Sequence, residues 1–511
     1  MGKLTEKLVY VLLLAIIGLS GTVLFFEDSL TGLVSVLKQS LAEHVDNSGR
    51  VLKIGYLFAP KDLNPWSTDQ VTQSRLLDVY EGLVSLDENL LIRPALAVSY
   101  GLVGEKEWHF HLRDGVKFHN GKELDISDVI YSLEQAKFLQ TEFAENVEKI
   151  KEVGQSELII LTKRPDPLLL NKLAKIAIVP VNFTDFSTPV GTGVYQVSDS
   201  SDLADISYQR NANYWSNLAY FPNLHVMSIS GKDDRVSALK NGQIDFLVNV
   251  PPDAANEIVD AGYELAKIPS LEVGFVMFNL KDDKLSSRSL RLAVAQALNK
   301  DSFLDLAYGF AKVIDQFIPN GVFGYNPQIS KIDFDKDAAE KELAKGFSSF
   351  ERIKLTFYFP DSLKLLGQYF KEQLVQVGID VDLKPISDQQ LQENLKKGDM
   401  QFYYMGWRHD TGDAISFLSQ VVHSPVSGFG EYNGNGYSNK LVDTLIEKSQ
   451  VNLNQQERLK DMQQIMKLIT EDDLIGVPLF ETESLFAYNK EMNFVPRVDS
   501  LVYPSQIKKA K

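Results

Sequence analysis

Residues 353–383 carry a strand–helix–strand pattern that narrows the possible folds more than any other stretch of the chain. Apolar side chains alternate at first, as in a half-buried strand, and then recur every three or four residues, as on one face of a helix. Gly378 stands where a helix C-cap is expected, and a second alternating run follows it. Residues 224–248 repeat this order, with Asn241-Gly242 as the stop signal. We therefore predict an α/β protein with parallel strands and right-handed crossovers.

Two such units in a chain of 511 residues predict two lobes with a ligand cleft between them. The hydrophobic fraction of 44% is ordinary for folded domains and argues against disorder. A formal net charge of −16 disfavours nucleic acid as a partner, because such a surface repels phosphate groups. The absence of cysteine excludes disulfides, thiol catalysis, cysteine-bound metals and a lipid-modified N-terminal cysteine.

The N-terminal segment 8–26 contains no charged residue and is predicted to target the chain to a membrane. At 1.5 Å per residue its length approaches the thickness of a bilayer core, roughly 30 Å. Lysines precede it, and Glu27 and Asp28 follow it, which predicts a cytoplasmic N-terminus and an extracytoplasmic body, periplasmic or at the cell surface. We expect an uncleaved transmembrane helix, with 27–50 as a stalk. The alternative is a signal peptide that is cleaved near residues 18–21.

The segment that begins at Trp108 reads WHFHLRDGVKFHNGKELDISDVIYS. Its first apolar side chains alternate with polar ones, among them His109 and His111, as in a strand with one buried face. The pair Asp114-Gly115 predicts a hairpin turn that leads into a partner strand at 116–118. This reading makes the segment a structural element rather than a reactive one.

With this segment the chain resembles the peptide-type extracytoplasmic solute-binding proteins of ABC importers, which form the peptide/nickel family 5. The resemblance covers about residue 51 to about residue 500, and further motifs follow in the family's order. They are N-P at Asn64, Y-E-G-L at Tyr80, P-A-L-A at Pro94, V-G-T-G-V-Y at Val190, N-Y-W at Asn213, L-K-N-G-Q-I-D-F at Leu239, F-N at Phe278, L-R-L-A-V-A-Q-A-L-N-K-D at Leu290 and G-W-R-H-D-T-G-D at Gly406.

The resemblance implies a two-lobed periplasmic-binding-protein fold of type II, in its large peptide-binding subclass with an extra inserted subdomain. We expect the two strands that cross between the lobes near 269–278 and 476–480. The expected parts are lobe I at 51–78, 186–270 and 477–511, the inserted subdomain at 79–185, and lobe II at 271–476.

The resemblance also implies a ligand site after the G-W pair. Family peptide binders hold the ligand's α-ammonium with an aspartate at this spacing, and the matching residue is Asp410. A desolvated carboxylate would give that compact cation a charge-assisted hydrogen bond. Gly406, Trp407 and Tyr404 are the expected neighbours of the ligand, the two aromatic residues as the lining of its side-chain pockets.

Each of these assignments has a structural alternative. Asp410 and Asp413 could instead cap a turn around Gly412, and the two aromatic side chains could instead belong to the core. Two residues, Lys364 and Arg408, stay open as candidates to bind the carboxylate end of the ligand.

No serine-nucleophile, zinc-protease or kinase signature is present, so we expect no catalytic residues and no enzyme. The nearby histidines His109, His111 and His119 are expected to be solvated or hydrogen-bonded, because zinc needs three or four convergent ligands. Residues 191–193 (Gly-Thr-Gly) are expected to form a tight turn, since no phosphate-loop lysine follows them. We expect neither a metal nor a cofactor.

The resemblance therefore implies a monomeric protein that binds di- to oligopeptides in a closing cleft and delivers them to ABC permease subunits with a cytoplasmic ATPase. Two alternatives stay open. The same fold could bind a non-peptide solute such as an oligosaccharide, a nickel chelate or haem, and a surface sensor or enzyme could use the fold without transport.

Overall fold

The computed structural model describes residues 50–139, 141–347 and 352–510. The chain from Val51 onward forms one compact unit. The predicted membrane segment 8–26 and most of the predicted stalk lie outside the described residues. Within the described ranges, no helix is both long enough and apolar enough to cross a membrane.

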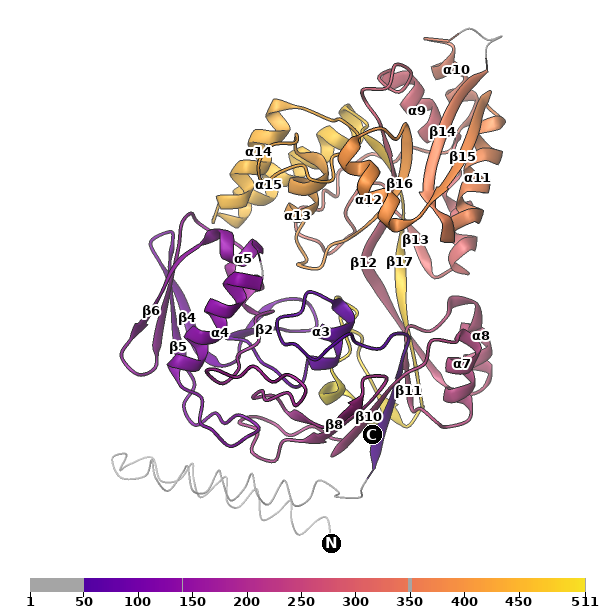
Figure 1. Cartoon of the computed structure of the whole chain (residues 1–511). Helices are drawn as coiled ribbons and strands as arrows, with labels where there is room; N and C mark the ends of the chain where they lie inside the picture. The colour runs from indigo at the N-terminus through magenta and orange to yellow at the C-terminus, as the bar shows by residue number, and fades with distance from the viewer. Residues whose placement is uncertain (1–49, 140, 348–351, 511) are drawn as a thin grey trace, which may run out of the picture. The chain divides into compact units, whose positions relative to one another are not determined.

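A central sheet runs through the whole of this unit in the order β15-β14-β16-β12-β17-β11-β1-β10-β9-β8, with β13 paired to β17. Figure 1 shows β12 and β17 side by side as the two long strands that connect its upper and lower parts. The strands are β1 (Val51–Tyr56), β8 (Tyr195–Asp202), β9 (Asp205–Arg210), β10 (Asn223–Ser228), β11 (Phe246–Val248), β12 (Glu264–Phe278), β13 (Ala311–Val313), β14 (Ile353–Pro360), β15 (Ile379–Ile386), β16 (Phe402–Arg408) and β17 (Gly476–Tyr488).

The predicted unit at 353–383 is confirmed. Strand β14 pairs in parallel with β15, and α11 (Lys364–Val375) between them buries Leu366, Phe370 and Leu374. Gly378 has a φ of +87°, which suits glycine at the end of a helix. The second predicted unit differs in its pairing. Strands β10 and β11 flank β1 and both run parallel to it, so the strand that returns after α7 (Lys232–Lys240) skips one position in the sheet.

The buried apolar side chains divide into two sets, which we use to define lobe I and lobe II. Core residues of lobe I lie within 52–258 and 485–507, whereas those of lobe II lie within 271–480. Strand β17 contributes buried residues to the cores of both lobes. Strand β12 contributes to the lobe II core and packs partly buried residues against the lobe I core, as expected for a strand that crosses between them. The residue boundaries expected from the sequence for the three parts stay predictions.

Helices cover both faces of the sheet. In lobe II, α13 (Ile415–Phe417), α14 (Lys440–Val451) and α15 (Gln455–Lys467) pack on one core, and α9 (Arg288–Ala297), α10 (Lys336–Leu343) and α11 pack on the other. Three further helices flank the central sheet: α3 (Gln70–Leu76), α8 (Ala255–Asp260) and α12 (Asp388–Lys397).

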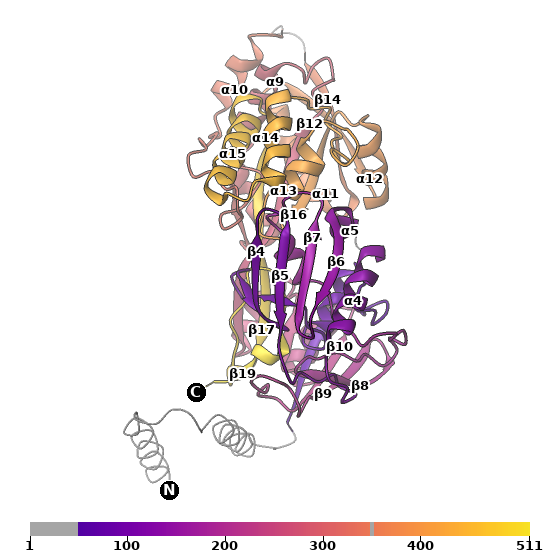
Figure 2. The same cartoon turned by 90° about the vertical axis from the view of Figure 1, so that its left-hand side faces the viewer.

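A second, four-stranded sheet lies within lobe I in the order β4-β5-β7-β6 and is seen in Figure 2 beside α4 and α5. A short ribbon of β2 and β3 precedes it. The elements are β2 (Val84–Leu86), β3 (Ile92–Pro94), β4 (Ala97–Val103), β5 (Glu107–Leu112), β6 (Val147–Val153), β7 (Glu157–Thr162), α4 (Ile126–Leu139), α5 (Thr141–Asn146) and α6 (Leu169–Leu173).

The hairpin predicted from Asp114-Gly115 is wrong. Strand β5 is confirmed, but its partners are β4 and β7, not residues 116–118. The segment after the turn instead makes its own small loop, closed by a bridge between Lys117 and Glu123. The glycine does adopt a positive φ of +71°, so the turn exists but does not join two strands of one hairpin.

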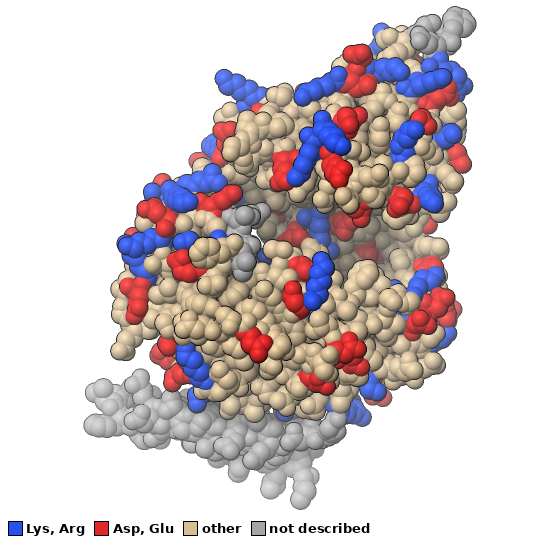
Figure 3. All heavy atoms as spheres, in the orientation of Figure 1, with Lys and Arg blue, Asp and Glu red and all other residues tan. Residues whose placement is uncertain are grey.

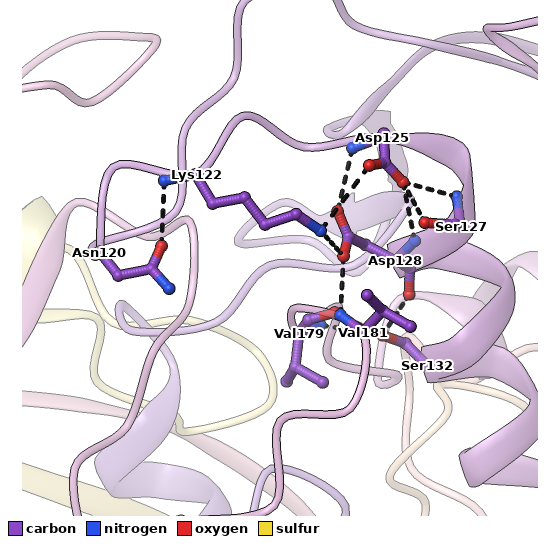
Figure 4. Close-up of polar contacts among 8 residues, drawn as sticks. All are labelled: Asn120, Lys122, Asp125, Ser127, Asp128, Ser132, Val179 and Val181. Atoms are coloured by element: carbon purple, nitrogen blue, oxygen red, sulfur yellow. Dashed lines mark hydrogen bonds and ion pairs between the residues drawn. The ribbon is translucent and has the colours of Figure 1, made fainter.

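The loop that follows ends at a buried carboxylate, shown in Figure 4. Asp128 is fully buried, pairs with the Lys122 ammonium and accepts a hydrogen bond of 2.7 Å from the Val181 amide. The Asp125 carboxylate accepts from the amides of Ser127 and Asp128 at 2.8 and 3.2 Å and so begins α4. These contacts give the Trp108 segment a structural role, because they fix its helix to the segment near residue 181.

Candidate ligand cleft

A cavity of about 510 Å³ opens against lobe I and is closed on one side by the end of β16. Figure 3 shows the surface of the described unit hollowed across its middle, with charged side chains inside the hollow. Polar side chains from both lobes line the cavity. They include Gln70, Asp78, Glu81, Trp215, Arg408 and Asp410.

Strand β16 carries the predicted site residues into the centre of the sheet, where it pairs with β12. Tyr404 is only 9% exposed and packs against Phe480 in the lobe II core, with ring centroids 6.4 Å apart. Burial raises the pKa of its phenol above the ordinary value. Tyr404 is therefore placed in the core and does not line the cavity.

Gly406 and Trp407 follow on the same strand. Gly406 is exposed and lies opposite Gly274 of β12. Trp407 packs edge-on against Phe417 and Tyr432, at centroid distances of 6.0 and 6.2 Å. Its buried indole N–H has no hydrogen-bond partner among the described residues. The contacts of Trp407 are those of a core residue, and its role toward a ligand stays a prediction.

Asp410 is the predicted residue that does line the cavity. Its side chain is 42% exposed, and both of its oxygens accept hydrogen bonds. One accepts from the Arg408 guanidinium at 2.8 Å, and the other accepts from the Gln70 amide of α3 at 3.2 Å. The carboxylate therefore faces lobe I from the end of β16, between a cation of its own lobe and an amide of the other.

The turn-capping alternative describes Asp413 rather than Asp410. The Asp413 carboxylate accepts from the Ile415 amide at 2.9 Å and pairs with Arg458. Gly412, with a φ of +67°, forms the turn just before it. Because Asp413 supplies the local contacts of this turn, the Asp410 side chain is directed to the cavity instead.

Of the two cations left open for the ligand's carboxylate, only Arg408 lines the cavity. Lys364 is exposed at the start of α11, in lobe II. Besides its bond to Asp410, the Arg408 guanidinium donates to the Asp499 carbonyl at 2.5 Å.

Sequence reasoning missed two acids that lie on the lobe I side of the cavity. Asp78 accepts hydrogen bonds from the Ser505 amide and hydroxyl at 2.8 and 2.7 Å, and burial raises its pKa to about 6. The Glu81 carboxylate accepts hydrogen bonds from three side chains: Thr192 at 2.7 Å, Tyr214 at 2.9 Å and Trp215 at 3.0 Å. Burial raises the pKa of Glu81 as well.

A sequence signal for the Glu81 site does exist. The acid belongs to the Y-E-G-L motif, and its partners belong to V-G-T-G-V-Y and N-Y-W, three motifs that carry the resemblance. Nothing in the sequence alone indicates that the three motifs meet.

The histidines near Trp108 do not converge. His109 contacts Glu107 and Glu157, each at 2.8 Å. The ring of His119 instead contacts the backbone of residues 191 and 193, at 3.2 and 3.0 Å, and His111 is exposed. In the described part of the chain, no group of three or more histidine, aspartate or glutamate side chains could hold a metal ion.

The geometry so far is a two-lobed α/β unit with two crossing strands and a polar cavity at their junction. The family model of bacterial extracellular solute-binding proteins, family 5, matches residues 92–429. The chain belongs to this family. It is therefore a non-enzymatic, extracytoplasmic solute-binding component of transport, as the sequence motifs predicted.

Curated relatives span most of this family 5 protein. It is 24% identical over 421 residues to a glutathione-binding protein of Pectobacterium atrosepticum, covering 77% of this chain and 81% of the relative. It is 22% identical over 449 residues to the dipeptide-binding protein of Escherichia coli, covering 79% and 84%. It is 25% identical over 475 residues to the nickel-binding protein NikA of Staphylococcus aureus, covering 90% and 92%.

Solved structures show the same fold as this family 5 protein. HbpA2 of Haemophilus parasuis superposes with a TM-score of 0.82 at 18% identity and covers 90% of this chain and 100% of its own. DppA of Helicobacter pylori, solved with the peptide STSA, superposes with a TM-score of 0.72 at 20% identity and covers 90% and 98%. The predicted α/β periplasmic-binding-protein fold with an extra subdomain is confirmed.

Proposed function

We propose that this family 5 protein binds peptides between its lobes and delivers them to an ABC permease with a cytoplasmic ATPase. The observation that carries the proposal is the place of Asp410. This carboxylate stands at the wall of a cavity large enough for a short peptide, on lobe II and in contact with Gln70 of lobe I. The names of the dipeptide-binding relative and of the peptide-bound structure support the same ligand class.

The chemistry of the site fits this ligand. A peptide N-terminus is a compact ammonium, and a half-buried carboxylate can give it a charge-assisted hydrogen bond. Closure follows from the same contacts, because a ligand that touches both lobes favours the closed form by the contacts it gains there. Hydrogen bonds to the peptide backbone would let the cleft accept many side-chain sequences.

A nickel complex is the second candidate, because one relative carries that name. The described residues offer no cluster of three acidic or histidine ligands. Such a complex would therefore have to arrive with its own chelator, which the cavity would recognise through its charged side chains.

The test is native mass spectrometry of the full chain, purified in detergent and mixed with a pool of di- to octapeptides. We expect peptide adducts and a rise in melting temperature, since a ligand that binds only the folded state stabilises it. A protein that retains a metal chelate or a sugar and takes up no peptide would contradict the proposal.

We also propose that the segment 8–26 stays attached as a membrane tether. Its support is the uncharged length of the segment and the lysines before it. Sequencing the N-terminus of the membrane-bound protein tests this. A mature chain that begins near residue 21 would show that the segment is cleaved.

A further inference from the structure

The cleft is bridged by contacts of the chain itself. Arg408, the last residue of β16 in lobe II, donates from Nη2 to the Asp499 carbonyl at 2.5 Å. Its Nε donates to Asp410 at 2.8 Å. The Asp410 carboxylate in turn accepts from Gln70 of α3 in lobe I. Two contacts therefore span the cleft, one from the Arg408 guanidinium and one to the Asp410 carboxylate of lobe II.

The segment that carries the acceptor of the first contact is bonded to lobe I, and its Val498 side chain also packs against the lobe II core. The Asp499 side chain forms an ion pair of 2.7 Å with the buried Arg497. Arg497 also donates to the Leu86 carbonyl at 3.2 Å, and the Val498 amide donates to the Glu88 carbonyl at 3.0 Å. The segment 497–499 is therefore fixed to the end of β2. A bond from Arg408 to this segment ties lobe II to lobe I.

The same side chain occupies the proposed ammonium site. Arg408 places a positive charge within hydrogen-bonding distance of one Asp410 oxygen, and Gln70 fills the other. A ligand ammonium that approaches Asp410 meets a carboxylate whose charge is already balanced. Both side chains are partly exposed, 27% for Arg408 and 42% for Asp410, and both line the cavity. An ion pair this exposed is weak enough to exchange its partner.

We propose that Arg408 is a built-in competitor for the ligand's cationic group. Without ligand, the guanidinium occupies Asp410 and, through the Asp499 carbonyl, holds the lobes together. When a peptide enters, its α-ammonium takes the place of Arg408 at Asp410. The ion pair therefore weakens the binding of ligands with a free cationic end, because their ammonium must displace Arg408, whereas a ligand with a neutral end leaves the pair in place. This inference rests on the proposed peptide-binding function and extends it to one specificity residue.

The first experiment compares Arg408→Gln with the wild-type full chain in calorimetric titrations. The probes are tetra-alanine with a free N-terminus and its N-acetylated form. Removing the competitor should tighten binding of the free-amine peptide by roughly fivefold, the upper range for an exposed ion pair. The affinity for the acetylated peptide should stay nearly constant. Lys175→Gln is the matched control, because it removes a cavity cation that has no contact with Asp410 in the structure.

Other outcomes of the titration overturn the inference. Equal weakening of both peptides would make Arg408 a structural residue. A loss for peptides with a free carboxylate, but not for C-amidated ones, would make it the site for the opposite end of the ligand. If the wild-type chain binds neither peptide, the proposed function fails, and with it the role of Arg408 as a competitor for peptides.

The second experiment needs no ligand and tests the bridge between the lobes separately. The chain has no cysteine, so Phe138→Cys in lobe I and Val426→Cys in lobe II give two unique spin-label positions. Both native side chains are exposed, at 84% and 56%. Electron–electron double resonance should show longer distances in the ligand-free Arg408→Gln variant than in the otherwise wild-type chain. Identical distance distributions would contradict the role of Arg408 in holding the lobes together.

Discussion

The Asp413 carboxylate, in the turn after β16, accepts two hydrogen bonds from the Arg458 guanidinium of α15, at 2.5 and 2.9 Å. Both side chains are almost fully buried, at 5% and 1% exposed. The pair fixes the turn that holds Asp410 to the helical layer of lobe II. A ligand-binding residue such as Asp410 keeps its position only if the turn that follows it is held in place.

Removing one partner of this pair should destabilise lobe II strongly. Asp413→Ala leaves the Arg458 charge buried and uncompensated, so we expect a loss of about 3 to 5 kcal/mol in the free energy of unfolding. Asp410→Ala, three residues earlier and half exposed, should cost less than about 1 kcal/mol. Urea unfolding of both variants measures the difference. Equal losses would mean that the two acids share one structural role.

Gly191 tests the close approach of the V-G-T-G-V-Y motif to the backbone just before the Y-E-G-L motif. A Cβ at this position would lie 2.0 Å from the Val79 carbonyl oxygen, and backbone has little room to move. Gly191→Ala should therefore destabilise the fold by about 2 kcal/mol or more. Gly101→Ala on β4 is the control, since its Cβ would meet nothing within 4 Å. A Gly191→Ala variant as stable as the control would contradict this packing.

Glu481 predicts a pH dependence of stability. It lies on β17 opposite Val273 at an irregularity in the pairing with β12, is 4% exposed, and has an oxygen with no hydrogen-bond partner among the described residues. Burial raises its pKa to about 7, with Lys312 of β13 opposing the shift and Glu483 adding to it. Because the folded pKa lies above the unfolded one, the neutral acid favours folding, and this contribution is lost as the pH rises from about 4.5 through 7.

Glu481→Gln should therefore be as stable as the wild type near pH 4.5 and more stable above pH 7. Melting temperatures of the two chains between pH 4.5 and 8 measure the gap. Glu257→Gln is the control, since that carboxylate is exposed and paired with Lys240 at 2.6 Å. A gap that stays constant with pH would contradict the raised pKa of Glu481.

Local patterns in the sequence were sufficient to predict individual helices and strands, but not which distant strands pair with one another. The βαβ unit at 353–383 could be predicted because its strands and helix are contiguous and the connection between parallel strands has one hand. The hairpin after β5 could not, because an Asp-Gly turn does not reveal that β7, about fifty residues later, is the true neighbour.

The site shows the same limit. A motif match could place Asp410 after a G-W pair, and it could leave Arg408 and Lys364 as open choices for the opposite end. It could not place Gln70 against Asp410, since 340 residues separate them. The Glu81 cluster joins residues that lie 111 to 134 positions apart. Contacts at such separations are set by the packing of the two lobes, which local periodicity does not record.

The most direct test of the account is a double-mutant cycle between Asp410 and the ligand's N-terminus. Wild-type and Asp410→Ala chains are titrated with one peptide in its free and N-acetylated forms. We expect the free peptide to lose about 2 kcal/mol on mutation, the low end for a charge pair because the ammonium must first displace Arg408. The acetylated peptide should bind both chains alike. Equal losses for the two peptides would contradict the account and place the ammonium site at another acid of the cavity.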